Sequence, residues 1–219
     1  MNKLKYHNLL LAIIATMTII TFAIVFTVNF KGLYYFDIGY LNIDKAVPLS
    51  VEQIKENYDA LIHYLSIFYQ GPLVLPDFVM SASGVKHFIE VKRIVDIIQI
   101  MCIVGIVIVI PVGIKRFKER DFMFFKWTSI ITVAIPSIIG FLASIDFSKA
   151  FIIFHKIMFR NNDWIFDERF DPVITILPEA FFMHGFILIV VIVLVLSTIS
   201  YYIYKRLLNT YNLENSLDS

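Results

Sequence analysis

Charged residues and cysteines are both scarce in this sequence, and each scarcity excludes a class of protein. Asp, Glu, Lys and Arg make up 17% of the 219 residues, whereas a typical soluble domain contains about 25%. The net charge of +1 argues against a nucleic-acid-binding surface. The one cysteine, Cys102, allows no intramolecular disulfide. It lies in an apolar run, where a lone thiol usually fills space as a small apolar side chain.

The short motifs that identify many enzymes are missing as well. The sequence has no Walker A motif, no Gly-x-Gly-x-x-Gly, no Cys-x-x-Cys and no His-Glu-x-x-His, which argues against nucleotide and zinc sites. It also has no Gly-x-Ser-x-Gly elbow for a nucleophilic serine. We therefore expect no metal and no cofactor. Any chemistry must come from isolated polar side chains.

Apolar residues, in contrast, are abundant, at 58% of the chain with a mean hydropathy of +0.76. A soluble domain of this size could not bury so much apolar surface, so a part of it must face lipid. A spanning helix needs about 20 mostly apolar residues. Four runs meet that length: 9–28, 94–114, 122–143 and 181–204. The expected fold is an all-α membrane protein with four transmembrane helices.

Lysine and arginine set the expected orientation, because these residues accumulate in cytoplasmic connections. They gather in three segments, which are 1–8, 115–121 and 205–219. With four spans, all three segments lie on one face, so we place both termini in the cytoplasm. The remaining segments, 29–93 and 144–180, then form an extracellular cap on a multi-pass protein of the cell membrane.

The cap segments contain many aromatic residues and one clear helix start. Ser50 and Gln53 have the spacing of a capping box, and the amphipathic run that follows predicts a helix that ends near Gly71. Pro72 and Pro76 then predict an irregular stretch. We expect a cap that is mostly helical and irregular, with room for short strands.

Polar residues that could take part in catalysis or binding lie at the expected boundary between cap and membrane. In the stretch 86–93, His87 and Glu90 share one helix face, and Lys86 has the spacing to pair with Glu90. The plain interpretation of this stretch is a charged helix entry whose lysines snorkel. Asp96, inside the second run, needs a partner, and Lys92 and Arg93 are the nearest cations.

A second polar and aromatic stretch begins at His155 and lies between the third and fourth runs. Its plain interpretation is an ordinary loop with a turn at Asn162-Asp163 and with Trp164 at the membrane interface. The other histidines, His7, His63 and His184, read more simply as headgroup, solvent or interfacial contacts.

Two motifs together resemble a known family. The sequence His87-Phe-Ile-Glu-Val-Lys92 is similar to a His-x-x-Asp-Val-Lys motif at the head of the second span. The second motif contains Phe154-His155, Phe159, Asn161, Trp164, Asp167, Asp171-Pro172 and Leu177-Pro178-Glu179. In this order, on a four-span chain, they resemble the lipoprotein intramolecular transacylase family of Gram-positive bacteria. Glu90 departs from the aspartate expected there.

The resemblance implies an acyltransferase whose substrate is a diacylglyceryl lipoprotein in the membrane. The acyl chain at glycerol sn-2 would move to the α-amino group of the N-terminal cysteine, giving a lyso-form lipoprotein. The implied catalytic residues are His87 and His155. The implied supporting residues are Glu90, Lys92, Asn161, Asp163, Trp164, Asp167 and Asp171. The implied partners are this lipoprotein and membrane lipid, with no nucleic acid.

Two alternatives remain on the residues alone. A non-enzymatic assembly factor or sensor could bind a partner through the aromatic cap. A small transporter is less favoured, because the spans contain almost no charge beyond Asp96 and Lys126 and no paired broken helices.

The charge distribution predicts the topology directly. Reporter fusions after Lys118 and after Arg206 should report the cytoplasm, whereas fusions near Gln70 and Arg169 should report the outside. A phosphatase and fluorescent-protein fusion pair at each position measures this. An external signal from the Lys118 fusion would overturn the orientation.

Overall fold

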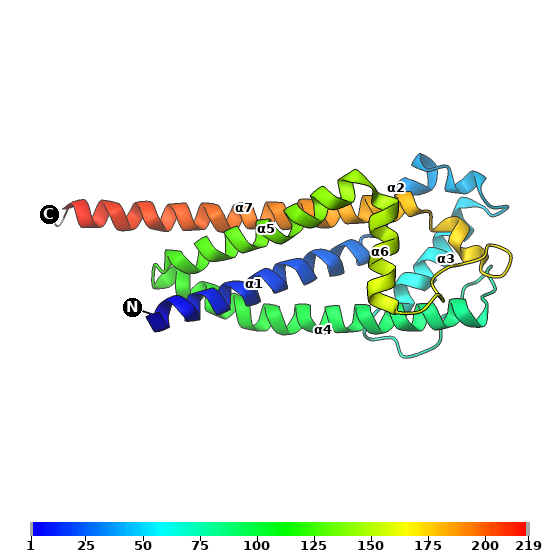
Figure 1. The fold of residues 1–219 in the computed structure, drawn as a ribbon, viewed down its shortest axis with the longest axis horizontal. Helices are drawn as coiled ribbons and strands as arrows, with labels where there is room; N and C mark the ends of the chain where they lie inside the picture. The colour runs from blue at the N-terminus through cyan, green and yellow to red at the C-terminus, as the bar shows by residue number, and fades with distance from the viewer. Residues whose placement is uncertain (1, 218–219) are drawn as a thin grey trace. The chain divides into compact units, whose positions relative to one another are not determined.

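The computed structural model describes residues 2–217, without the side chains of residues 2–7, Ile135, Leu142 and Leu217. Lys3, Lys5 and His7 therefore lie outside the described side chains. Within the described residues every regular element is a helix and there is no strand. The elements (Figure 1) are α1 (Asn2–Asn29), α2 (Lys31–Tyr40), the 3₁₀ helix η1 (Ile43–Lys45), α3 (Val51–Tyr64), α4 (Ala82–Lys118), α5 (Phe122–Ile145), α6 (Phe147–Phe159), the 3₁₀ helix η2 (Pro172–Ile176) and α7 (Glu179–Leu217).

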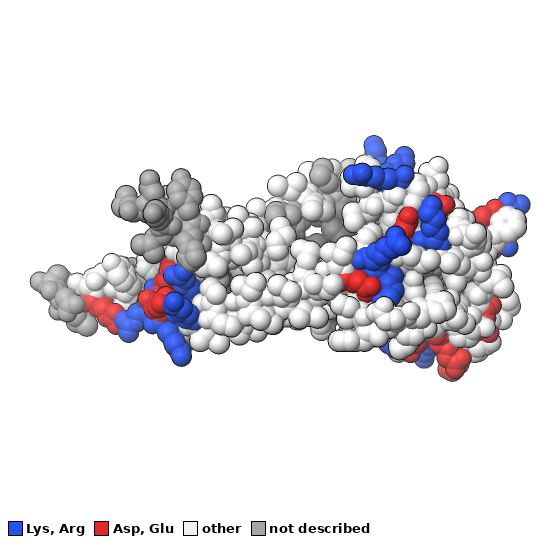
Figure 2. Space-filling view, turned by 90° about the horizontal axis from the view of Figure 1, so that it is seen from below, with Lys and Arg blue, Asp and Glu red and all other residues white. Residues whose placement is uncertain are grey.

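Four of these helices are long and apolar enough to cross a membrane. They occupy Asn8–Asn29, Ala82–Lys118, Phe122–Ile145 and Glu179–Ser216. The expected number of apolar helices is therefore confirmed, and each of the four contains one of the apolar runs. Figure 2 shows a broad surface on which no Lys, Arg, Asp or Glu side chain is drawn, as lipid-facing surface requires. Two of the helices extend well beyond the apolar runs. Helix α4 begins twelve residues before its run, at residue 82, and α7 continues after its run through residues 205–217.

The chain divides into two compact units. Unit 1 contains Met1–Ile24, Ile100–Phe141 and Ile189–Ser219, and unit 2 contains Val25–Gln99 and Leu142–Leu188. The long helices α1, α4, α5 and α7 each contribute to both units. Unit 2 contains all the short helices and every residue that the sequence motifs single out.

Small hydroxyl side chains connect the helices of unit 1. The hydroxyl oxygens of Thr16 and Thr132 lie 2.9 Å apart, and both residues are fully buried. The hydroxyl of Ser197 donates to the Ser129 carbonyl at 2.9 Å, and that of Ser200 donates to a further α5 carbonyl. In lipid, where the hydrophobic effect does not drive helices together, such contacts and close packing hold a bundle together.

The core of unit 2 joins the two segments that lie between the spans. Tyr34 of α2 stacks on Tyr58 of α3 with ring centroids 3.7 Å apart, and its hydroxyl donates to the Ile176 carbonyl at 2.8 Å. Val173 and Ile176 of η2 are buried in the same cluster. Residues 29–93 and 144–180 therefore fold as one body around a shared apolar core.

Helix α3 begins as the sequence predicts and ends earlier. Both hydrogen bonds of the capping box between Ser50 and Gln53 are present, so that prediction is confirmed. The helix stops at Tyr64 rather than near Gly71. The carbonyls of Leu65 and Ser66 turn instead toward α4.

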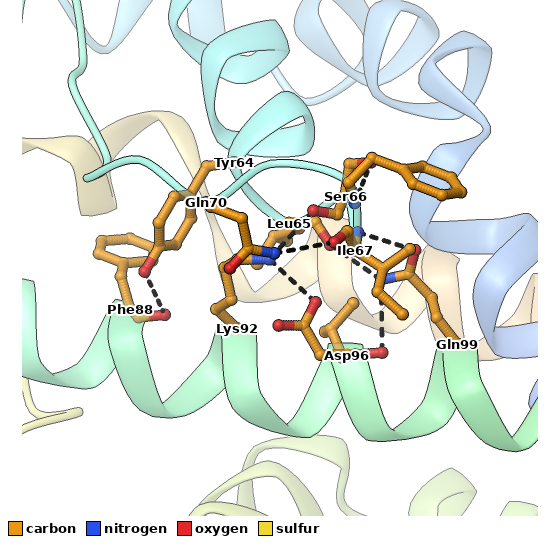
Figure 3. A network of polar contacts seen from close by, with 11 residues as sticks. Tyr64, Leu65, Ser66, Ile67, Gln70, Phe88, Lys92, Asp96 and Gln99 are labelled. Atoms are coloured by element: carbon orange, nitrogen blue, oxygen red, sulfur yellow. Dashed lines mark hydrogen bonds and ion pairs between the residues drawn. The ribbon is translucent and has the colours of Figure 1, made fainter.

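Two polar residues of α4 bind that turn, as Figure 3 shows. Lys92 donates to the Ser66 carbonyl at 3.0 Å and to the Asp96 carboxylate at 2.9 Å. The Gln99 side chain donates to the Leu65 carbonyl at 2.9 Å and accepts from a main-chain N–H of the same turn. The expected pairing of Asp96 is confirmed with Lys92 as its partner. These bonds satisfy backbone groups that apolar surroundings would penalise.

The close approach of α1 and α4 generates a prediction for unit 1. A Cβ added at Gly105 would lie 2.3 Å from the Thr18 hydroxyl oxygen, whereas one at Gly113 meets no atom within 4 Å. Thr18 is β-branched and has little freedom to move away. We expect Gly105→Ala to lower the free energy of unfolding by about 1–3 kcal/mol, and Gly113→Ala to be neutral or slightly stabilising. Thermal unfolding in detergent measures both, and equal effects would contradict the contact.

Candidate functional site

His87 and His155 are neighbours in the folded chain. His87 lies in the second turn of α4, and His155 lies on α6, which follows α5 after the single residue Asp146. The centroids of the two imidazole rings are 6.1 Å apart with an interplanar angle of 35°. The two rings are close enough for one reacting group to reach both, and the expected convergence of the two histidines is confirmed.

Aromatic rings surround the pair. Phe159 contacts both imidazoles, with centroids 4.6 Å from His87 and 5.5 Å from His155. The Phe166 ring lies 5.4 Å from His87, and the Trp164 ring lies 4.9 Å from His155. Such walls exclude water and strengthen any electrostatic interaction that forms between them.

The main chain of α6 fixes the tautomer of His155. Its Nδ1 lies 2.7 Å from the carbonyl oxygen of Phe151. Because a carbonyl can only accept, Nδ1 must carry the proton, and Nε2 of the neutral ring is left with its lone pair. Burial lowers the pKa of His155, although the Phe151 carbonyl acts in the opposite direction. At neutral pH the ring is therefore a neutral base.

His87 is the more deeply buried histidine, with 7% of its surface exposed. Its Nδ1 has no hydrogen-bond partner among the described residues. An unpaired buried polar atom is costly and usually reflects a functional demand. The nitrogen is thus available to a group that is not part of the chain.

The loop after α6 is fastened to α4 on both sides of His87. The Asn161 side-chain amide donates to both carboxylate oxygens of Glu90, at 2.9 and 3.0 Å. Lys86 forms an ion pair with Asp163 of the same loop. The proposed pairing of Lys86 with Glu90 is therefore replaced by two contacts to the loop. The Trp164 indole N–H donates to the Asn161 carbonyl at 2.9 Å, which orients the indole over His155.

Asp171 fixes the start of α4, one turn before His87. Its carboxylate accepts from the Ser81 main-chain N–H at 2.8 Å and from the Ser81 hydroxyl at 2.7 Å. The Ser81 hydroxyl in turn caps the helix by accepting from the Gly84 N–H. A negative charge is favourable at a helix N-terminus. Gly84 is required there, because a Cβ would lie 2.1 Å from the Asp171 carboxylate.

Two of the predicted supporting residues lie in other contacts. Lys92 donates to the Ser66 carbonyl and the Asp96 carboxylate, as described above. Asp167 forms a local turn with the exposed Arg169. Hydrogen bonds from the Arg169 side chain and main chain lower the pKa of Asp167 to about 2. Both residues therefore support the fold around the site.

A buried acid–histidine pair was missed by the sequence interpretation. Asp37 of α2 is completely buried, and its carboxylate oxygens lie 2.8 and 3.0 Å from Nδ1 of His184 on α7. His184 had been expected to be interfacial. An aspartate between Phe36 and Ile38 in an aromatic segment was the one available signal, because a buried carboxylate needs a partner.

Comparison with known proteins extends these observations. A family model described as lipoprotein intramolecular transacylase Lit matches residues 9–182. A solved structure of the membrane integral lipoprotein intramolecular transacylase Lit from Bacillus cereus has a TM-score of 0.92 and 36% identity, covering 97% of this chain and all of that one. No curated protein sequence matched.

Two further structures of the Bacillus cereus protein, each with one histidine substituted, are also similar. The arginine variant has a TM-score of 0.84 and covers 96% of this chain and 95% of its own. The alanine variant has a TM-score of 0.85 and covers 96% of both chains. The identity is 36% in each case. The likeness therefore extends over nearly the whole chain.

The Asp37–His184 pair generates a stability prediction. His184→Ala leaves a fully buried carboxylate without its partner, so we expect the free energy of unfolding to fall by about 2–3 kcal/mol. His63→Ala is the matched control, because His63 is an exposed histidine of the same unit and should cost less than about 0.5 kcal/mol. Thermal unfolding in detergent compares the two. Equal stability of both variants would contradict a role for the pair in the fold.

Proposed function

Because this chain belongs to the lipoprotein intramolecular transacylase family, we propose that His87 and His155 carry out the acyl transfer of that family here. The substrate is a diacylglyceryl lipoprotein with a free α-amino group on its N-terminal cysteine. The amine nitrogen bonds to the sn-2 carbonyl carbon, and the bond from that carbon to the glyceryl oxygen breaks. The product is a lyso-form lipoprotein with an N-acyl chain.

His155 is the proposed general base. An α-amino group has a pKa near 8 and is a nucleophile only after losing a proton. The His155 Nε2 lone pair can accept a proton from the attacking nitrogen, because Nδ1 is held by the Phe151 carbonyl. Burial lowers the pKa of His155 below that of a free imidazole, so the ring is largely unprotonated at neutral pH and ready to accept a proton.

His87 is the proposed partner of the ester. A buried imidazole N–H beside the carbonyl can donate to the oxyanion that develops during attack. The same ring can pass its N–H proton to the departing glyceryl oxygen, and the proton that His155 takes from the amine then restores it. Its Nδ1, unpaired among the described residues, gives this ring a free hydrogen-bonding position that the substrate can fill.

The remaining residues of the site are proposed to hold substrate and histidines in place. Amine and ester belong to one molecule, so bringing them together supplies much of the acceleration. The Asn161–Glu90 and Asp163–Lys86 contacts fix the loop that carries Trp164. Asp171 fixes the helix start that carries His87. Lys92 and Asp167 stabilise adjoining turns.

The reaction fits the proposed location at the extracellular face of a bacterial membrane. Converting an ester to an amide is energetically downhill, so neither ATP nor coenzyme A is needed. The positive-inside pattern of the connections supports an extracellular position for residues 29–93 and 144–180, which make up most of unit 2. An assembly or sensor role is not favoured, because two histidine rings 6.1 Å apart, that of His87 buried and that of His155 partly covered, are suited to catalysis.

The mechanism predicts the behaviour of alanine variants. His87→Ala and His155→Ala should each reduce lyso-form product by about 10²-fold or more, because each removes an acid–base group. His63→Ala should retain full activity. The assay is mass spectrometry of the lipoprotein N-terminal peptide after incubation of purified enzyme with diacyl substrate. Full activity in both variants would rule out the assignment.

The same assay tests whether the transfer is intramolecular. The product should keep the total acyl mass of the substrate, and an isotopically labelled bystander phospholipid should contribute no label. Label on the cysteine amine would indicate transfer from a second lipid. Chromatographic monodispersity of each variant in detergent distinguishes lost chemistry from lost folding.

A further inference from the structure

Helix α6 has two faces of opposite character. On one face, Phe147, Phe151, His155 and Phe159 follow one another at intervals of four residues, with successive ring centroids 6.2, 4.1 and 5.5 Å apart. This face packs inward, since Phe159 is buried and the other three are partly covered. The remaining surface of the helix is largely open.

Large apolar side chains cover much of that open surface. Their exposed fractions lie between 40% and 66%, and they are Ile152, Ile153, Phe154, Ile157 and Met158. Four of them, Ile153, Phe154, Ile157 and Met158, occupy adjoining positions around the helix and expose apolar surface that water would penalise. A surface of this kind requires an apolar partner.

Neighbouring contacts place α6 at the end of the membrane spans. The spanning helix α5 ends at Ile145, and Asp146 caps α6 by accepting from the Lys149 N–H. Phe147 and Phe151 contact Phe186 and Phe182 in the first two turns of α7, itself a span. The helix therefore begins where two spans reach the membrane boundary.

The direction of α6 and the charges of its side chains agree with a position at the membrane boundary. Figure 1 draws α6 across the direction of the parts of α4 and α7 in the same unit, as for a helix lying along a membrane surface. Lys149, Lys156 and Arg160 are exposed, and α6 itself contains no acidic residue. Helices that lie in the interface combine an apolar face with lysine and arginine of this kind.

We propose that α6 lies in the lipid interface, with its exposed apolar face among acyl chains and Lys149, Lys156 and Arg160 at the headgroup phosphates. The lysine stems reach along the apolar surface while their ammonium groups stay with the phosphates. The partner of this surface is thus the lipid leaflet, rather than a protein or a second copy of the chain.

This placement has a consequence for the reaction, which rests on the proposed function. Glyceryl esters lie at the boundary between headgroups and acyl chains. His155 lies on α6, so the immersed helix holds the proposed base at the depth of the ester. The placement of α6 itself is independent of catalysis and is tested without an activity measurement.

Spin-label depth measurements test the proposal. Nitroxides are attached at Ile157→Cys, Phe154→Cys and Lys156→Cys in a Cys102→Ala background, with the full chain in vesicles of phosphatidylethanolamine and phosphatidylglycerol. Val79→Cys is the matched control, since Val79 is an apolar residue of the same unit that is 74% exposed and lies outside the spans. Power saturation with oxygen and with a water-soluble nickel chelate gives the depth of each label.

The labels at Ile157 and Phe154 should be at least about fivefold more accessible to oxygen than to nickel, because oxygen concentrates in acyl chains. The Lys156 label should be shallower than both, and the Val79 label should favour nickel. Nickel accessibility at Ile157 and Phe154 would overturn the proposal by placing α6 in water. Protection from both reagents would also overturn it, since a protein would then cover the face.

Discussion

The bond between the Asn161 amide and the Glu90 carboxylate is the contact on which the site depends. It joins the loop after α6 to the helix that carries His87, over a sequence separation of 71 residues. Lys86 and Asp163 add a second connection one helical turn away. These ties hold the loop that carries Trp164, whose indole donates to the Asn161 carbonyl and lies 4.9 Å from the His155 ring. Glutamate is long enough to make the contact, even though the family motif suggests aspartate.

Much of the fold could be predicted from the sequence, because lipid imposes strong and simple rules. Runs of about 20 apolar residues and the bias of Lys and Arg gave the four spans and a proposed orientation. The capping box at Ser50 and Gln53 and the partner of Asp96 were also predicted correctly. Each depends on residues within four positions of one another, where spacing alone determines the geometry. The pairing of His87 with His155 was expected through the resemblance, since the two residues are 68 positions apart and no local pattern connects them.

The features that could not be predicted from the sequence are determined by contacts between residues far apart in the chain. Helix α3 stops at Tyr64 because Lys92 and Gln99 of α4 bind the carbonyls that follow it. Lys86 turns away from Glu90 because Asp163 offers a partner that helix periodicity does not reveal. The pairing of Asp37 with His184 spans 147 positions. Propensity and periodicity contain no information about such partners, which become visible only when the chain is folded.

The hydrogen bond from His155 Nδ1 to the Phe151 carbonyl limits how the imidazole can gain and lose protons during a catalytic cycle. With one nitrogen committed to the main chain, the ring has a single position through which a proton can enter and leave. Transfer from a neutral amine to an ester consumes no proton overall, because the one removed from nitrogen is the one required by the glyceryl oxygen. Each turnover therefore returns the imidazole to its starting state. A closed proton cycle of this kind needs no water channel, which suits an enclosure of Phe159, Trp164 and Phe166.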